Sequence, residues 1–318
     1  MGLPTETVYG LAADADNPQA VAKIFAAKGR PKDHPLIVHV QDAAGVAHFA
    51  QDVPDFARRL ISAFWPGPVT LILPRVPAMA AAAAGGQNSI GLRCPSHPVA
   101  QALLQALRGL PQPVWGVAAP SANQFGRVSP TSALHVESEF GAELLILDGG
   151  SCAIGIESTI IDCTRGVPVL LRPGNLTREA LSAACGQKVL LTEELAMGEP
   201  AAPRASGTLE SHYAPLARVR LMEARALQTA LDLVGADVDG KNGGKPVIAT
   251  WSRAILTSRS STILRRRMPD DASATAQQLF AVLREFDATG VKLIWIETLP
   301  DAPEWDGVRD RLQRAAAS

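Results

Sequence analysis

The chain has 318 residues, of which 47% are hydrophobic, and a net charge of −1. This length predicts two domains or one large one, and this composition is too apolar for a disordered chain. Because the charges nearly cancel, no overall field favours nucleic acid or an acidic membrane surface, so any site for a polyanion has to be local.

The cysteines and the hydropathy pattern narrow the class of protein further. No two of the four cysteines form a CxxC pair, which argues against a disulfide scaffold or a zinc site, and we expect buried thiols instead. These are Cys94, Cys152, Cys163 and Cys185. No run reaches the roughly 18 apolar residues of a membrane helix. No signal sequence opens the chain, so we expect a soluble, cytoplasmic protein without membrane contact.

Helical and strand periods alternate along the first 192 residues, which predicts an α/β fold. The first helix has Asn17 as its predicted N-cap, Pro18 in its first turn and Gly29 at its end. Further helices are predicted over residues 54–64, 97–108 and 130–140, the last capped by Ser129. Strands are predicted over residues 36–40, 69–74, 89–94, 114–120, 144–150, 158–163 and 168–174.

Residues 193–215 are rich in Pro, Gly, Ser and Ala and show no clear period, which predicts a linker between a domain over 1–192 and another over 216–318. The linker is long for a passive connection. The second domain again alternates, which predicts a smaller α/β domain. Its predicted strands cover residues 217–223, 245–252 and 292–298, and its predicted helices cover 273–290 and 307–317.

A basic turn, "KGRPKDHP" at residues 28–35, follows the first predicted helix. The helix dipole accounts for a cation at the position of Lys28, in the last helical turn. It does not account for Arg30 or Lys32, which lie beyond the helix in a turn that Pro31 and Pro35 stiffen. A rigid turn that carries several cations suits an oligophosphate, since the charges are held in place before the ligand arrives.

Other polar residues stand beside predicted strands, where α/β proteins bind ligands. Arg93 and Arg172 follow strand-like runs and could grip a carboxylate or phosphate, or could be surface arginines. His39 alternates with apolar neighbours, which fits a pocket residue or a hydrogen-bonded core histidine. The chain has no GxxxxGK[ST] loop and no GxSxG elbow.

Seven stretches, taken together and in this order, resemble the threonylcarbamoyl-AMP synthase family. They are "PTETVYGL", "KIFAAKGRPKDHPLIVHV", "WPGPVTLIL", "APSANQFGRVSPT", "IESTIID", "LLRPG" and "SHYAP". The resemblance covers residues 3 to about 215 densely and the rest in outline. It implies a YrdC-like twisted mixed-sheet domain, followed by a smaller Rossmann-like α/β domain.

The resemblance also implies a reaction. L-threonine, bicarbonate and ATP would give threonylcarbamoyl-AMP and pyrophosphate, with magnesium accompanying ATP. The product would pass to a tRNA threonylcarbamoyl transferase, with at most a weak contact between this chain and tRNA. The carbamate of threonine attacks the α-phosphorus, so the reaction needs alignment and charge neutralisation rather than a protein nucleophile.

The family resemblance assigns roles to particular residues. Lys28 and Arg30 would act in catalysis. The residues implied for ATP binding are Lys28, Arg30, His34, Ser89, Ser121, Asn123, Arg172 and Tyr213. The residues implied for threonine binding are Thr5, Thr7, His39, Arg93, Ala119 and Ser158. No residue is assigned as a metal ligand. Tyr213 would reach over the nucleotide and make the linker a lid.

The chain departs from the family pattern at two points. The family has roughly 25 further residues, a strand and a helix, before the "PTET" motif, so either the start is misassigned, the chain was shortened, or the sheet lacks an edge strand. His34 stands where asparagine is common in the family, which leaves its role open.

Two alternative functions also remain. One is an RNA-binding module that uses "RRR" at 265–267, and the other is a carbamoyl-transfer enzyme with another acceptor.

Overall fold

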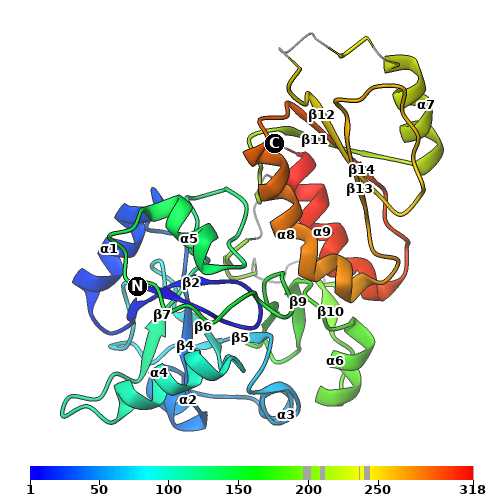
Figure 1. Ribbon diagram of the computed structural model, residues 1–318. Coiled ribbons are helices and arrows are strands. Elements are labelled where there is room, and N and C mark those ends of the chain that lie inside the picture. The colour runs from blue at the N-terminus through cyan, green and yellow to red at the C-terminus, as the bar shows by residue number, and fades with distance from the viewer. Residues whose placement is uncertain (196–201, 208–211, 236, 240–243, 318) are drawn as a thin grey trace. The chain divides into compact units, whose positions relative to one another are not determined.

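The computed structural model describes residues 1–195, 202–207, 212–235, 237–239 and 244–317. The chain divides into two compact units, whose elements are labelled in Figure 1. The first unit holds Met1–Phe125 and Ser129–Thr208, and the second holds Gly126–Val128 and Leu209–Ser318. Residues Gly126–Val128, which the sequence places inside the first predicted domain, therefore group with the second unit.

The first unit contains two sheets. A small antiparallel sheet pairs β1 (Gly2–Leu3) with β2 (Gly10–Leu11). The large sheet has the order β10-β9-β8-β5-β6-β4-β7-β3. Its strands are β3 (Ala13–Asp14), β4 (Ile37–Val40), β5 (Val69–Pro74), β6 (Ser89–Arg93), β7 (Gly116–Ala118), β8 (Thr159–Asp162), β9 (Val169–Arg172) and β10 (Leu190–Leu191). Parallel pairs such as β4–β6 lie beside antiparallel pairs such as β5–β6, so the predicted mixed sheet is confirmed.

The helices of the described first unit are α1 (Pro18–Lys28), α2 (Ala43–Phe49), α3 (Asp55–Phe64), α4 (Pro98–Arg108), α5 (Ala133–Phe140) and α6 (Arg178–Cys185), with a 3₁₀ turn at Thr192–Glu194. Helix α1 begins and ends as predicted. The side chain of Asn17 accepts hydrogen bonds from two main-chain N–H groups, and Gly29 is left-handed with φ of 59°. Only glycine adopts this conformation without strain, so the basic turn leaves the helix at a fixed point.

Two predictions about the first unit are wrong. Residues 144–150 form no strand, because only Ile146 pairs there, in an isolated bridge with Gly2. Ser129 does not cap a helix. Its hydroxyl donates to the carboxylate of Glu157, and Ser132 caps α5 instead. The sequence prediction also omitted α2 and α6.

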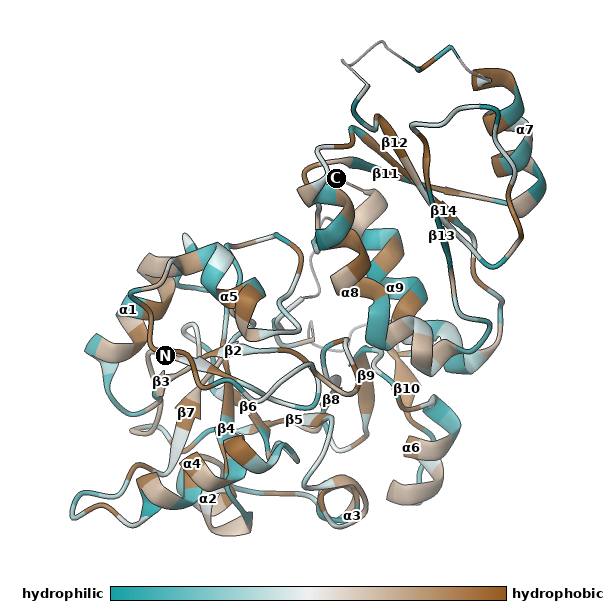
Figure 2. Cartoon of the chain, viewed as in Figure 1, coloured by the Kyte–Doolittle hydropathy of each residue, from teal (hydrophilic) through white to brown (hydrophobic). Residues whose placement is uncertain are grey.

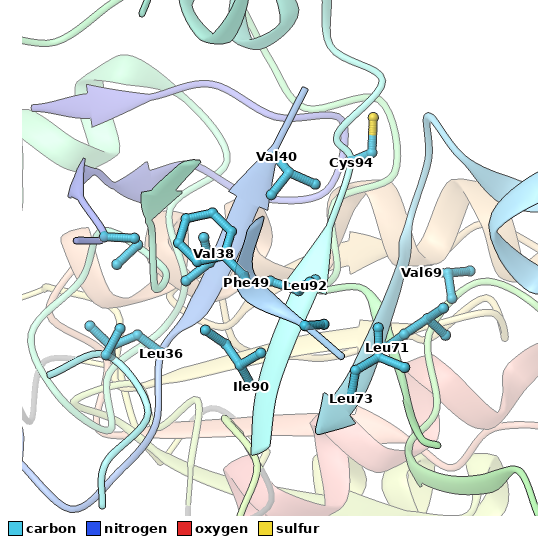
Figure 3. Packing of buried hydrophobic residues seen from close by; sticks show 14 of the residues in the cluster. Leu36, Val38, Val40, Phe49, Val69, Leu71, Leu73, Ile90, Leu92 and Cys94 are labelled. Carbon is cyan, nitrogen blue, oxygen red and sulfur yellow. The ribbon is translucent and has the colours of Figure 1, made fainter. Parts of the chain in front are cut away.

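The central strands β4, β5 and β6 have one hydrophobic and one polar face. The hydrophobic face packs into the core with Phe49, as Figure 3 shows. It carries Val38, Val40, Leu71, Leu73, Ile90 and Leu92. Because side chains alternate along a strand, the intervening residues point to the opposite face. His39 lies beside Arg93 in the β4–β6 register, so both share this second face, where the candidate site lies.

The second unit has a four-stranded, all-parallel sheet of order β11-β14-β12-β13, in agreement with the predicted smaller α/β domain. Its elements are β11 (Arg218–Met222), α7 (Ala224–Val234), β12 (Ile248–Ser252), β13 (Leu264–Arg267), α8 (Ala272–Ala288), β14 (Leu293–Glu297), a 3₁₀ turn at Pro303–Trp305 and α9 (Asp306–Ala316). The prediction omitted α7 and β13. Buried residues such as Phe280 and Leu283 alternate with polar ones along α8, which Figure 2 shows as brown and teal bands.

The hydropathy of the described helices settles one further question. No helix in this part of the chain is long and apolar enough to cross a membrane. All four cysteines are buried free thiols, as predicted.

Candidate active site

The polar face of the first sheet borders a narrow hollow. Its floor comes from β4, β5, β6 and β8, and its cover comes from the predicted linker. The lining residues are Pro35, Leu36, Ile37, Thr70, Ile72, Gln87, Ser89, Gly91, Ile160, Arg204, Ala205 and Ser206. The volume is about 20 Å³, which is room for about one water molecule.

Lys28 is turned inward rather than into solvent. Its side chain is 2% exposed, and Nζ donates to the main-chain oxygens of Ser121 and Asn123. Burial, helped by the charge of Arg30, lowers the pKa of Lys28 to about 7. A surface lysine that only satisfied the helix dipole would be solvated, so the dipole alone does not account for Lys28, and its role in ATP binding stays a prediction.

Arg30 is also buried, with 8% of its side chain exposed. Its guanidinium donates to the main-chain oxygen of Pro35 and to Oγ of Ser206, each at 3.0 Å, and lies over the Phe125 ring. His34 contacts the same ring edge-on, with 5.4 Å between ring centroids. Burial and the charge of Arg30 lower the pKa of His34, which disfavours a second cation beside Arg30.

Arg172 and Ser158 form the next group along the polar face. Nε and Nη2 of Arg172 donate to the main-chain oxygen of Ser158 at 3.0 and 2.9 Å. Oγ of Ser158 lies 2.7 Å from Oγ1 of Thr70, which the neighbouring strand β5 supplies. Nη1 of Arg172 donates to the main-chain oxygen of Ser206 at 2.8 Å. Arg30 and Arg172 therefore bind the same serine from two sides.

We call residues 204–206 the strap, because they cover the hollow. Arg204 pairs with Asp33 in the basic turn at 2.6 Å and donates to the oxygen of Gly85 at 3.1 Å. Its main-chain N–H and oxygen bind the side-chain amide of Gln87. Ser206 donates to the oxygen of Pro35 at 2.9 Å. Polar contacts therefore hold the strap in place. Two of them come from the buried arginines Arg30 and Arg172, which both bind Ser206.

Arg93 lies on the same face and is engaged by the "PTET" segment. Nη1 donates to Oγ1 of Thr7 at 2.6 Å, Nη2 pairs with Glu6 at 2.6 Å, and Nε donates to the oxygen of Gly67 at 3.2 Å. Both charged side chains are buried. Burial alone would raise the pKa of Glu6, but the charge and hydrogen bond of Arg93 more than offset it and hold that pKa below its usual value.

His39 is neutral in this environment. It is 4% exposed, and burial together with the charge of Arg93 lowers its pKa to about 3. In the described structure no hydrogen-bond partner reaches its buried Nδ1. This nitrogen distinguishes His39 from a fully hydrogen-bonded core histidine, and its role in threonine binding stays a prediction.

Comparisons with known proteins agree with this geometry. A family model described as "Telomere recombination" matches residues 1–174, and one described as "Threonylcarbamoyl-AMP synthase, C-terminal domain" matches residues 176–317. The threonylcarbamoyl-AMP synthase of Bacillus subtilis is 37% identical, over 99% of this chain and 89% of that protein. The chain belongs to the threonylcarbamoyl-AMP synthase family.

Two further members of the family are similar over almost the whole chain. The threonylcarbamoyl-AMP synthase of Pyrococcus abyssi is 36% identical, over 99% of this chain and 90% of that protein. A solved structure of P. abyssi Sua5 in complex with L-threonine matches with a TM-score of 0.84 and 34% identity, over 99% of this chain and 89% of that one. The similarity therefore extends over both units of this family member.

The remaining predicted residues are placed as follows. Ser89 lines the hollow, and the main-chain oxygens of Ser121 and Asn123 hold Lys28. The main-chain N–H of Ala119 is used within the sheet, in a bond to Ile37. Thr5 lies 2.9 Å from Thr7 between the two hydroxyl oxygens and accepts bonds from its own turn, so it orders the segment that carries Thr7.

Tyr213 belongs to the second unit. It is 1% exposed, has φ of 61°, and packs against the Phe280 ring and the guanidinium of Arg311. These contacts lie within the second unit and do not test a contact with the nucleotide. The role of Tyr213 as a lid therefore stays a prediction.

The sequence prediction missed two residues that the structure brings into the site. Glu6 stands inside the quoted "PTETVYG" motif but received no role, although an acid between two threonines is a usable signal. Ser206 lies in the predicted linker, in a stretch of small residues without any local signal. Within the described residues, no three His, Cys, Asp or Glu side chains gather closely enough to hold a metal ion.

Proposed function

We propose that this chain synthesises threonylcarbamoyl-AMP from L-threonine, bicarbonate and ATP and releases pyrophosphate. The observation that carries the proposal is the pair of buried arginines Arg30 and Arg172, which both bind Ser206 in the lining of the covered hollow. Lys28, also buried, stands at the helix end that leads to Arg30. Buried, pre-positioned cations suit a polyanion, since they neutralise its charge without reorganising at the moment of reaction.

The hollow of about 20 Å³ is far too small for ATP while the strap covers it. We therefore expect residues 204–206 to leave when ATP binds. Phosphate oxygens would then take the place of Ser206 between Arg30 and Arg172. Each such contact would join a cation to an anion, which makes it stronger than the present contact with a neutral hydroxyl or main-chain oxygen.

Threonine is proposed to bind beside Arg93. The guanidinium already holds Glu6 and Thr7, so it acts on the amino acid through the position of Thr7 and through N–H donors that the pair with Glu6 leaves available. The neutral ring of His39 and the hydroxyl of Ser158 would complete this part of the pocket. The carbamate formed from threonine and bicarbonate would attack the α-phosphorus, and AMP would be transferred to it as a nucleotidyl transfer.

The proposed chemistry at the phosphates needs no protein carboxylate as a metal ligand. A magnesium ion that arrives with ATP would be bound by phosphate oxygens and water, because no Asp or Glu is among the described residues that line the hollow. It would supply charge neutralisation at the phosphates. The labile product is proposed to pass to a tRNA threonylcarbamoyl transferase in the cytoplasm, and any contact of this chain with tRNA would be weak.

Pyrophosphate release tests the proposal. It should require ATP, threonine and bicarbonate together, and a threonylcarbamoyl adenylate should be detectable by mass spectrometry before it hydrolyses. Release that is unaffected by the omission of threonine would contradict the proposed substrate and favour a carbamoyl transfer to another acceptor. Binding of tRNA without any turnover of ATP would favour an RNA-binding module.

A further inference from the structure

The second unit has an open hollow on one face of its parallel sheet, beside the edge strand β13. Its volume is about 460 Å³, within the range of small-molecule pockets. The lining residues are Thr250, Ala254, Ile255, Leu256, Ile263, Leu264, Arg265, Arg266 and Arg267. Thr250 belongs to β12, Leu264 and the three arginines belong to β13, and the other four residues belong to the loop that joins the two strands. In open α/β sheets, loops that follow the carboxyl ends of strands are where ligands bind.

The register of β12 and β13 decides which arginines point into the hollow. Thr250 pairs with Arg265, and Ser252 with Arg267, so these side chains share one face of the sheet. Arg266 shares the other face, where it pairs with Glu285 of α8. The three arginines of "RRR" therefore lie on two faces of the sheet. Arg266 pairs with helix α8, and Arg265 and Arg267 lie on the face that carries the hollow.

Arg265 has no carboxylate partner among the described residues. Its one side-chain bond is from Nη1 to the main-chain oxygen of Leu256, at 3.3 Å. Nη2 of Arg267 donates to both carboxylate oxygens of Asp270, at 3.0 Å each, in a pair that is at least half exposed on both sides and therefore screened by salt. Arg265 and Arg267, on alternate positions of one strand, each keep N–H donors that these bonds do not use and that could bind the same anion.

The rest of the hollow is apolar. Leu256, Ile263 and Leu264 contribute partly or fully buried side chains, and Ile255 is 90% exposed at its rim. A large aliphatic side chain so exposed, beside an arginine without an acid, fits a ligand that has both an apolar body and an anionic group.

We propose that this hollow binds an organic phosphate monoester, whose phosphate lies between Arg265 and Arg267 and whose body packs on Ile255 and Ile263. Phosphate is favoured over carboxylate because it offers three oxygens and up to two negative charges to two planar guanidinium forks. The site lies wholly within the second unit and is separate from the residues proposed for adenylation.

The test uses the full-length chain with isotope-labelled isoleucine methyl groups, followed by NMR. Adenosine monophosphate is the organic probe, and inorganic phosphate is the second probe. The Ile255 and Ile263 signals, assigned with Ile255→Val and Ile263→Val, should shift and saturate with the nucleotide. Arg265→Ala and Arg267→Ala should each weaken this binding about tenfold, the usual effect of losing one charged contact.

Arg218→Ala is the matched control, because Arg218 is an exposed arginine on β11, the opposite edge of the same sheet. It should leave the affinity unchanged, and pyrophosphate release should be normal in all three arginine variants. The proposal is overturned if the two methyl signals do not saturate at millimolar nucleotide, or if Arg218→Ala weakens binding equally. Shifts of the same affinity with inorganic phosphate alone, or shifts with tRNA only, would also overturn it.

Discussion

Arg172 donates a hydrogen bond from Nη1 to the main-chain oxygen of Ser206, at 2.8 Å, while Arg30 donates to the hydroxyl of the same serine. A neutral residue of the predicted linker thus accepts from two buried guanidinium groups where phosphate oxygens are proposed to bind. Strap and nucleotide compete for the same donors, so contacts that hold the strap should weaken the binding of ATP.

Arg204→Ala tests this competition. The variant loses the pair with Asp33 and the bond to Gly85, so the strap should leave more often. Because exposed pairs contribute little, the KM for ATP should fall only about two- to fivefold. Lys188→Ala, which breaks an exposed pair with Glu194, is the control. A higher KM for ATP in Arg204→Ala would mean that the strap supports binding instead.

Lys28→Met should reduce activity and should also change how the free energy of unfolding depends on pH. Pyrophosphate release should fall by about a hundredfold or more, as for other lost electrostatic contacts in active sites. The folded pKa of about 7 lies below the value of 10.5 for an exposed lysine. The unfolded chain therefore binds more protons between these two values, so the free energy of unfolding of the parent should rise across that window.

The variant lacks this titration, so the difference in unfolding free energy between Lys28→Met and the parent should change from pH 7 to pH 10. Urea denaturation at several pH values measures it. Lys32→Met, on the exposed side of the turn, should leave the slope unchanged. Parallel pH profiles for the parent and Lys28→Met would show that Lys28 is not a buried cation.

Glu6→Gln should affect threonine more than ATP. The substitution leaves Arg93 buried without its counter-ion, which destabilises the fold by about 3–5 kcal/mol and disturbs Thr7. We expect a KM for threonine raised about tenfold or more, against a small change in the KM for ATP.

The pair of Glu6 and Arg93 should also make the stability of the protein depend on pH. Because the pKa of Glu6 is lowered in the folded state, its stabilisation is present above pH 4.5 and is lost as the pH falls through the folded pKa.

That acid-dependent loss should be reduced in Glu6→Gln, and denaturant titrations at pH 3 to 6 compare the two proteins. Glu179→Gln, in the first turn of α6, is a control acid outside the site. Equal rises in both KM values would indicate a general loss of structure and remove the assignment of this cluster to threonine.

His39 should not appear in the pH dependence of the reaction. Its pKa of about 3 keeps the ring neutral throughout the pH range of the assay. His39→Gln should therefore lower kcat/KM by a roughly constant factor from pH 5.5 to 9, with no change in the shape of the profile. An inflection near pH 6.5 that disappears in the variant would show that the imidazole titrates during turnover.

Local signals in the sequence predicted those parts of the site that depend on short-range structure. Asn17, Pro18 and Gly29 define α1, and the helix end places Lys28 and Arg30. The β-alternation of residues 36–40 likewise places His39 opposite the core face. These features follow from capping and from the two-residue period, which are properties of neighbouring residues.

Such local signals could not predict contacts between residues that are far apart in the sequence. Arg30 and Ser206 are 176 positions apart, and no local pattern marks a serine in a stretch of small residues as their meeting point. The pairing of Glu6 with Arg93 depends on the register of distant segments in the same way. The helix α6 and strand β13 were missed because their sequences are short and mixed in character, so tertiary packing decides them.

The two-faced character of β6 has a consequence for how the chain finds its register. A slip of one residue would turn Arg93 into the aliphatic core and bring Leu92 to the polar face. A guanidinium among Val38, Leu71 and Phe49 would lack any acceptor, and the cost of such a buried charge far exceeds the small differences that separate alternative strand pairings. The residues selected for chemistry therefore also help to specify the fold, so that mutations at the site could increase misfolding as well as reduce turnover.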